Sequence, residues 1–163
     1  MMPNDPAENE PPPFARGRQK TGVLVVDDEP GVRKLLELVL REQGFDVWAA
    51  ANGKEAIECC WRKDNDVDLV LLDVRMPDLD GPQVLANLRK LNPQIQACFM
   101  TGWSGSYTEE QLLKLGAVCI LKKPFGMREL VQALRKMIDI PSSGPDCSYL
   151  LSVNELLARL VAS

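Results

Sequence analysis

Four short runs of uninterrupted apolar residues restrict the fold of this chain more than any other feature of its sequence. The runs occupy residues 23–26, 69–72, 97–100 and 118–121. Continuous apolar character, rather than strict alternation, is typical of strands that are covered on both faces, as in a parallel sheet. A fifth segment, residues 46–49, alternates and therefore predicts a strand at the edge of that sheet.

Segments that alternate with these runs predict helices over residues 30–43, 53–63, 81–91, 109–115 and 127–139. Three of the predicted helices begin with the spacing of a capping box, in the pairs Asn52 and Glu55, Asp80 and Gln83, and Thr108 and Gln111. Five strands that alternate with five helices predict an α/β, doubly wound, five-stranded parallel sheet with right-handed crossovers. The expected strand order is 2-1-3-4-5, as in flavodoxin-like folds.

Both ends of the chain differ from the central region, which we expect to form one domain over residues 21–140. Residues 1–20 hold five of the 12 prolines without apolar periodicity, which predicts a disordered leader. Residues 141–163 begin as a turn-rich linker and continue as a short amphipathic C-terminal helix, whose apolar positions are Val153, Leu156, Leu157, Leu160 and Val161. That helix could pack on its own domain, form a homodimer or dock on a partner.

The composition excludes several classes of function. A net charge of −4 argues against direct nucleic-acid binding, which uses a basic surface. No segment is long and apolar enough for a membrane span or a secretory signal, so we expect a cytoplasmic protein without membrane contact. The chain has no histidine, which excludes Ser-His-Asp catalysis, histidine-ligated metals and an internal phosphohistidine. Its five cysteines are expected to stay reduced.

Acidic side chains follow two of the apolar runs. The first run leads into Asp27 and Asp28, and the second leads into Asp73. In a doubly wound sheet, ligands bind beyond the carboxyl ends of the strands, where the strand order reverses. If the first and third strands are neighbours, the three carboxylates converge, and their mutual repulsion calls for a cation. Because oxygen ligands suit a hard divalent ion, the sequence predicts a Mg²⁺ site.

A hydroxyl and an ammonium group stand at two further strand ends. Thr101 follows the fourth predicted strand, and Lys122 and Lys123 follow the fifth. Beside a metal-bound carboxylate these groups suit phosphoryl transfer, because positive charge neutralises the transferring group and the hydroxyl binds an oxygen of the product. Carboxylates are also nucleophiles that form aspartyl phosphates.

Four fragments at these strand ends resemble the response-regulator receiver domains of bacterial two-component signalling. They are D-D-E-P from Asp27, L-L-D-V-R-M-P-D-L-D-G from Leu71, M-T-G from Met100 and K-K-P-F from Lys122. The resemblance covers roughly residues 21–140 and implies a single-domain phosphoprotein, or a receiver fragment, of a phosphorelay. Such a protein receives a phosphoryl group from a histidine kinase or a phosphotransfer protein, acts on a protein target, and is not a turnover enzyme.

The resemblance also implies a role for each site residue. Asp73 stands at the phosphoacceptor position, Lys123 at the position that pairs with the phosphoryl group, and Thr101 at that of the switch hydroxyl. The implied Mg²⁺ ligands are Asp27 through water, Asp28, Asp73 and the backbone carbonyl of Arg75. Lys122 is expected to be solvated or to face a helix, because adjacent strand residues point in opposite directions.

One position departs from the family pattern, and an alternative function is considered. Ile120 stands where many members of the family carry an aromatic switch residue, so the route from Thr101 to the output is not evident. Gly81 is expected to relieve a strained backbone before a helix.

The alternative function is a receiver fold that serves as a protein-interaction or dimerisation module without regulation by phosphorylation. A haloacid-dehalogenase-type phosphatase is disfavoured, because Arg75 occupies the position of its second acid.

Overall fold

A five-stranded parallel sheet forms the centre of the computed structural model, which describes residues 20–62, 66–102 and 107–139. The predicted order is confirmed as β2-β1-β3-β4-β5, with every neighbouring pair parallel. The strands are β1 (Gly22–Val26), β2 (Asp46–Ala50), β3 (Leu69–Asp73), β4 (Gln96–Thr101) and β5 (Cys119–Lys122). Residues 1–19 of the predicted leader and all residues after 139, including the predicted linker and C-terminal helix, lie outside the described residues.

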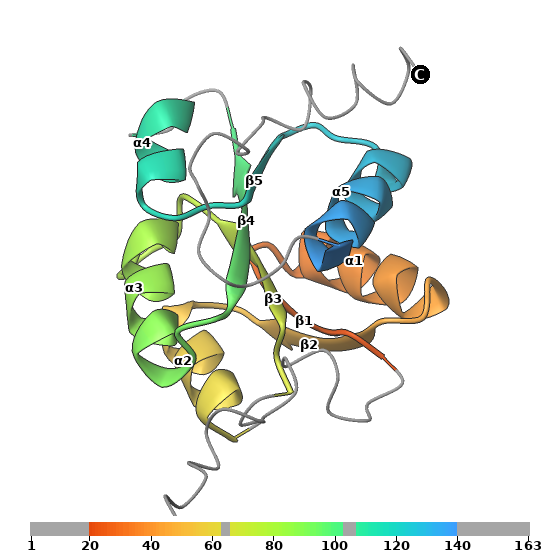
Figure 1. Cartoon of the computed structure of the whole chain (residues 1–163), viewed down its shortest axis with the longest axis horizontal. Helices are drawn as coiled ribbons and strands as arrows, with labels where there is room; N and C mark the ends of the chain where they lie inside the picture. The colour runs from red at the N-terminus through yellow and green to blue at the C-terminus, as the bar shows by residue number, and fades with distance from the viewer. Residues whose placement is uncertain (1–19, 63–65, 103–106, 140–163) are drawn as a thin grey trace, which may run out of the picture.

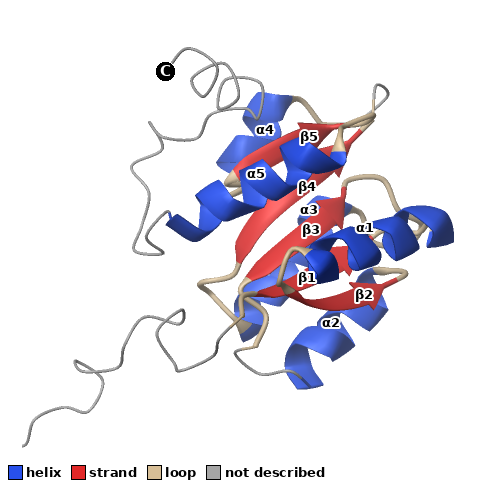
Figure 2. Cartoon of the chain, turned by 90° about the vertical axis from the view of Figure 1, so that its right-hand side faces the viewer, coloured by secondary structure: helices blue, strands red, loops and turns tan. Residues whose placement is uncertain are grey.

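Five helices cover the two faces of the sheet (Figures 1 and 2). Helices α1 and α5 lie on one face, and α2, α3 and α4 lie on the other. Their bounds are α1 (Pro30–Glu42), α2 (Gly53–Arg62), α3 (Gly81–Leu91), α4 (Glu109–Lys114) and α5 (Met127–Asp139). None of the helices in the described part of the chain is long and apolar enough to cross a bilayer.

The two helical layers explain why the strands are apolar without interruption. In β1, Leu24 and Val26 belong to the core beneath α2 and α3, whereas Val23 and Val25 belong to the core beneath α1 and α5. All five residues of β1 and of β3 are buried. Strand β2 lies at the edge of the sheet, as predicted, and mixes exposed and buried residues without strict alternation. The parallel pairing between these buried strands sets the register of their ends.

The helix starts follow the predicted caps with one difference. The side chains of Asp80 and Thr108 each accept a hydrogen bond from the third backbone N–H of their helix, and both capping boxes are complete. The side chain of Asn52 likewise accepts from the Glu55 N–H at 2.9 Å. However, the Glu55 carboxylate accepts from the N–H of Ala51, not from that of Asn52, so the third capping box is not formed as expected.

Gly81 is required for a reason that differs from the expected one. The positive φ in this loop belongs to Asp78, at 69°, and Gly81 is not in the left-handed region. Instead, a Cβ on Gly81 would lie 2.6 Å from the carbonyl oxygen of Asp73 and 3.0 Å from the Cα of Val74. The expectation of backbone strain was therefore wrong, and the missing side chain allows the start of α3 to pack directly on the end of β3.

We expect Gly81→Ala to lower the free energy of unfolding by about 1–3 kcal/mol, because the new methyl group must displace backbone atoms beside Asp73. Urea denaturation measures this change. Gly31→Ala is the matched control, since a Cβ there would meet no atom within 4 Å and alanine is the better helix former. Equal stability of Gly81→Ala and the wild type would contradict the close packing of α3 on β3.

Candidate functional site

Four strand ends meet at the carboxyl edge of the sheet. The register pairs Val26 with Leu72 and Thr101 with Lys122, so the residues that follow β1 and β3, and those that follow β4 and β5, stand at similar heights. Asp73 is itself the last residue of β3 and pairs with Met100. Because all neighbouring strands are parallel, the polar residues of four separate segments lie on one edge, as the sequence predicted.

Three carboxylates gather where β1 and β3 end. One oxygen from each of Asp27, Asp28 and Asp73 lies within 4.8 Å of the other two. Asp27 is completely buried and Asp73 is 7% exposed, whereas Asp28 is open to solvent. This donor set of closely spaced carboxylate oxygens, with one open side, fits a hard divalent cation that keeps part of its water shell.

Lys123 provides the positive charge that the protein itself contributes to this cluster. Its Nζ lies 2.9 Å from Oδ2 of Asp27 and 3.6 Å from Oδ1 of Asp73. The other oxygen of Asp27 accepts the backbone N–H of Glu29 at 2.9 Å. Asp27 is therefore held by two donors, and the ammonium group of Lys123 bridges the buried carboxylate and the more accessible one.

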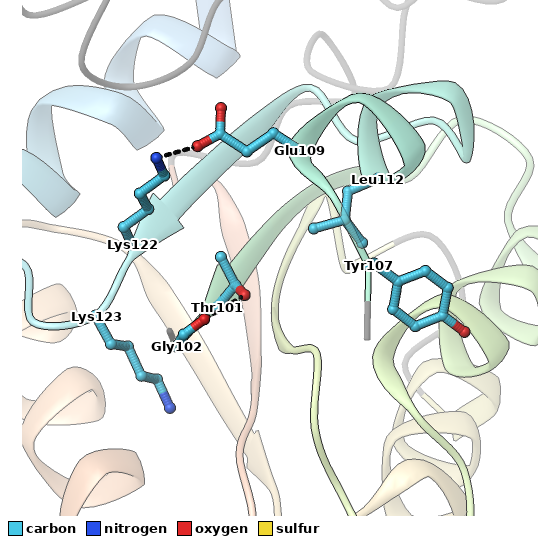
Figure 3. Close-up of a pocket in the computed structure, with 7 residues that line it drawn as sticks. All are labelled: Thr101, Gly102, Tyr107, Glu109, Leu112, Lys122 and Lys123. Atoms are coloured by element: carbon cyan, nitrogen blue, oxygen red, sulfur yellow. Dashed lines mark hydrogen bonds and ion pairs between the residues drawn. The ribbon is translucent and has the colours of Figure 1, made fainter. Parts of the chain in front are cut away.

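Lys122 points elsewhere, as expected for the neighbouring residue on a strand. Its ammonium group forms an ion pair with Glu109, in the first turn of α4 (Figure 3). In the same view, the side chain of Lys123 extends away from that pair. The prediction that Lys122 would be solvated or face a helix is confirmed, because its side chain is exposed and also pairs with a residue of α4.

The electrostatics of the cluster act most strongly on Asp73. Burial, followed by the negative charge of Asp27, raises the pKa of the Asp73 carboxyl from 3.8 to about 6, and the ammonium of Lys123 only partly opposes this. For Lys123, burial alone would lower the pKa, but the hydrogen bond to Asp27 and the charge of Asp73 raise it above its usual value. The site thus holds more negative charge than its lysine neutralises, which favours a bound cation.

Thr101 stands at the strand end next to the acidic cluster, and its hydroxyl is bonded elsewhere. Thr101 is the last residue of β4 and is 8% exposed. Its hydroxyl donates to the carbonyl oxygen of the next residue, Gly102, at 3.2 Å (Figure 3). The hydroxyl therefore has a local partner that it can exchange for a ligand at the cluster.

The roles assigned to the individual residues remain predictions, but their positions are now defined. The structure brings together Asp27, Asp28, Asp73 and Lys123, with Thr101 at the neighbouring strand end. The backbone N–H of Arg75 forms a hydrogen bond that lowers the pKa of Asp73. The expected role of the Arg75 carbonyl as a ligand stays a prediction.

Sequence reasoning missed one polar contact beside the site. The hydroxyl of Tyr107 donates to Oδ2 of Asp80 at 2.7 Å, which links the segment before α4 to the start of α3. The two residues are 27 positions apart, and no spacing rule connects them. The only available signal was Asp80 itself, which was predicted as a helix cap but whose second oxygen had no assigned partner.

The comparisons with known proteins agree with this geometry. A family model described as "Response regulator receiver domain" matches residues 23–135. The chain is 31% identical over 121 residues to Sporulation initiation phosphotransferase F of Bacillus subtilis, which covers 74% of this chain and 96% of that protein. It is also 35% identical over 117 residues to Sensor kinase CckA of Brucella abortus, covering 72% of this chain but only 12% of the kinase.

Solved structures give the same result. A response regulator receiver domain protein from Clostridium thermocellum aligns with a TM-score of 0.69 and 27% sequence identity, over 73% of this chain and 94% of that one. Several other relatives are much longer than the matched region, and the chain spans 27% of the regulatory protein AtoC of Escherichia coli.

Proposed function

The chain belongs to the response regulator receiver domain family, and on that basis we propose that it is a phosphorylation-dependent signalling switch whose phosphoacceptor is Asp73. The observation that supports this most directly is the position of Asp73 between two other carboxylates and the ammonium group of Lys123. The Asp73 carboxylate is buried except for a small exposed area through which it would meet a donor, and its neighbours offer a cation site.

The phosphoryl donor in this proposal is a phosphohistidine on a separate protein. The chain contains no histidine and so cannot supply that group itself. Two of its relatives are named as a sensor kinase and as a phosphotransferase. We infer that a histidine kinase or a phosphotransfer protein is the partner of this chain.

In the transfer step, one carboxylate oxygen of Asp73 attacks phosphorus as the bond between phosphorus and the donor imidazole nitrogen breaks. Lys123 exchanges its contact with Asp27 for one with the incoming phosphoryl oxygens. Asp27, Asp28, Asp73 and the Arg75 carbonyl would hold Mg²⁺, which supplies positive charge to the transferring group. The Thr101 hydroxyl leaves Gly102 and donates to an oxygen of the product.

The output of this switch is protein–protein contact. Movement at Thr101 reaches the segment that leads into α4 and the adjoining surface formed by residues 107–139, which shifts between two packings. Slow loss of the phosphoryl group to water would reset the switch without making the chain a turnover enzyme.

A direct test uses a small phosphodonor in place of the partner. We expect incubation with acetyl phosphate and Mg²⁺ to add one phosphoryl group to the intact protein, as seen by mass spectrometry, and EDTA to prevent it. The cation is required because the three carboxylates otherwise repel an anionic donor. Mg²⁺ alone should raise the thermal unfolding midpoint, because it binds only the folded cluster.

The same experiment addresses the alternative of an interaction module that ignores phosphorylation. Membership of the receiver family does not favour that alternative. A protein that gained no mass and showed no response to Mg²⁺ would support it and refute the switch. Size-exclusion chromatography with light scattering, with and without the phosphodonor, then shows whether the oligomeric state depends on phosphorylation.

A further inference from the structure

A groove lies between helix α1 and the start of α5. The two helices share one face of the sheet (Figures 1 and 2). The groove has a volume of about 370 Å³. Its lining residues all belong to the described part of the chain and are Val32, Leu35, Leu36, Lys123, Pro124, Phe125 and Met127.

The surface of this groove is apolar. Lys123 is the charged residue among those that line it, and its ammonium group is bonded to the acidic cluster. Phe125 and Met127 pack against the core beneath α1 and α5 and stay partly exposed. Leu35 is 50% exposed, and Leu38, one turn further along α1, is 54% exposed. Such a surface suits the apolar side of an amphipathic helix.

The other ends of the two helices are joined directly. The guanidinium of Arg135 on α5 donates to the side-chain oxygen of Gln43 at 3.2 Å and to its backbone carbonyl at 3.5 Å. Gln43 is the residue that follows α1. The two helices are therefore fastened at one end and leave the groove at the other.

The sequence contains a segment whose apolar side matches this surface. It is the predicted amphipathic helix at residues 152–161, which lies outside the described residues. A helix this short is marginal in water by itself, so its apolar stripe requires a surface to cover it. The positions of that stripe are Val153, Leu156, Leu157, Leu160 and Val161.

The length of the connection lets this segment reach the groove of its own chain. Helix α5 has 13 residues and is about 20 Å long, and it leads from the groove at Met127 to Asp139. Residues 140–151 can span about 40 Å when extended, so the chain can return along α5. Because the tether sets a local concentration of about millimolar, the chain's own segment competes well against that of a second copy.

We propose that residues 152–161 dock as an amphipathic helix in the groove between α1 and the start of α5, with their leucines against Leu35 and Phe125. Since Lys123 and Pro124 also line the groove, the docked segment lies directly beside the acidic cluster. One consequence rests on the proposed function: a protein that donates a phosphoryl group to Asp73 has to displace the segment, whereas a small donor does not. The docking itself is independent of that function.

Hydrogen–deuterium exchange of the full chain, without Mg²⁺ or a phosphodonor, tests the docking. We expect the backbone amides of residues 152–161 to exchange about tenfold or more slowly than those of an unstructured peptide. Leu35→Asp places a charge in the wall of the groove and should return these amides to the unstructured rate. Unstructured rates in the wild type, or full protection in Leu35→Asp, would overturn the proposal.

Two control variants show whether the effect belongs to the groove. Leu35→Met keeps an apolar side chain of similar size and should keep the protection. Leu91→Asp makes the same change at the end of α3, on the other face of the sheet, where Leu91 is 42% exposed. It should also keep the protection. Protection lost in Leu91→Asp but kept in Leu35→Asp would place the segment on that other face and refute the groove.

A reciprocal variant keeps the test valid even if Leu35→Asp does not fold. Leu157→Asp changes only the segment, outside the receiver domain. The first N–H groups of α5 have no acceptor within the helix, so their exchange reports on a cover over the groove. We expect the amides of residues 127–129 to exchange faster in Leu157→Asp than in the wild type. Equal rates there would also contradict the docking.

The same measurement separates the chain's own segment from that of a second copy, and the docking from the proposed function. Protection that is independent of protein concentration, in a chain that light scattering shows to be a monomer, supports the proposal, and protection lost on dilution would overturn it. If the wild type takes up no phosphoryl group from acetyl phosphate, the role of Asp73 is refuted while the exchange result stands. If uptake occurs and the segment is unprotected, only the docking is wrong.

Discussion

Asp73→Asn is expected to abolish phosphoryl uptake from acetyl phosphate and, at the same time, to make the Mg²⁺-free protein more stable. The amide cannot act as the nucleophile, so no mass gain should appear. The stability gain follows because burial, and then the negative charges of Asp27 and Asp28, raise the pKa of Asp73 to about 6. Above that pH its charge destabilises the folded state, and we expect the variant to gain about 1–2 kcal/mol at neutral pH.

The stability gained by Asp73→Asn should depend on pH. The pKa of Asp73 in the folded protein lies above its ordinary value of 3.8, so the penalty is absent below pH 3.8 and complete above about pH 6. The advantage of Asp73→Asn in urea denaturation should therefore shrink as the pH falls from 7 toward 4. Mg²⁺ should stabilise the wild type more than the variant, because the variant retains fewer carboxylates at the cluster.

Asp78→Asn is the matched control for this variant. Asp78 is exposed, lies in the same loop, and has a φ of 69°, which asparagine tolerates as well as aspartate does. The control should keep both phosphoryl uptake and the stability of the wild type. Phosphorylation that persisted in Asp73→Asn would show that another residue is the acceptor.

Lys123→Met is expected to slow phosphoryl uptake by about 100-fold or more, while Mg²⁺ binds more tightly. The rate falls because the variant lacks the ammonium group that would neutralise the transferring phosphoryl group. The Mg²⁺ affinity should rise, on the order of tenfold, because in the wild type the ammonium group of Lys123 competes with a cation for the charge of Asp27 and Asp73. Mass spectrometry over time measures the first change, and calorimetry measures the second.

Lys122→Met tests whether this effect is specific to one of two adjacent lysines. The ammonium group of Lys122 pairs with Glu109 on α4 and does not contact the acidic cluster in the described structure. Its removal should leave the phosphorylation rate and the Mg²⁺ affinity close to those of the wild type. If both lysine variants behaved alike, net charge rather than the position of Lys123 would explain the result.

The fold was predictable to a large extent because its signals are local. Uninterrupted apolar runs such as residues 69–72 reflect burial on both faces of the sheet, and the alternating run at residues 46–49 reflects an edge. The caps at Asp80 and Thr108 were likewise readable, since a side chain that bonds the third N–H of its own helix depends on sequence spacing alone. The Asn52 side chain caps its helix as predicted, but the reciprocal bond from Glu55 was not readable, because this side chain could reach either of two neighbouring backbone N–H groups.

The residues of the site were also evident from the sequence, though their contacts were not. Asp27, Asp73, Thr101 and Lys123 each follow or end a strand, and parallel strands bring their carboxyl ends to one edge. Which oxygen of Asp27 meets Lys123, and how strongly burial acts on Asp73, depend on distances that no motif contains. The need for Gly81 was recognised, but its cause, the close approach of the Asp73 carbonyl, was not.

The sequence by itself determined the order of the elements, the sheet to which they belong, and the side chains that stand at its carboxyl edge. It did so because periodicity and chain direction are properties of neighbouring residues. Tertiary structure alone decided that Lys122 faces Glu109 and that Tyr107 bonds Asp80 beside a pocket. These contacts join segments that meet only after the helices have packed, so the packing sets them.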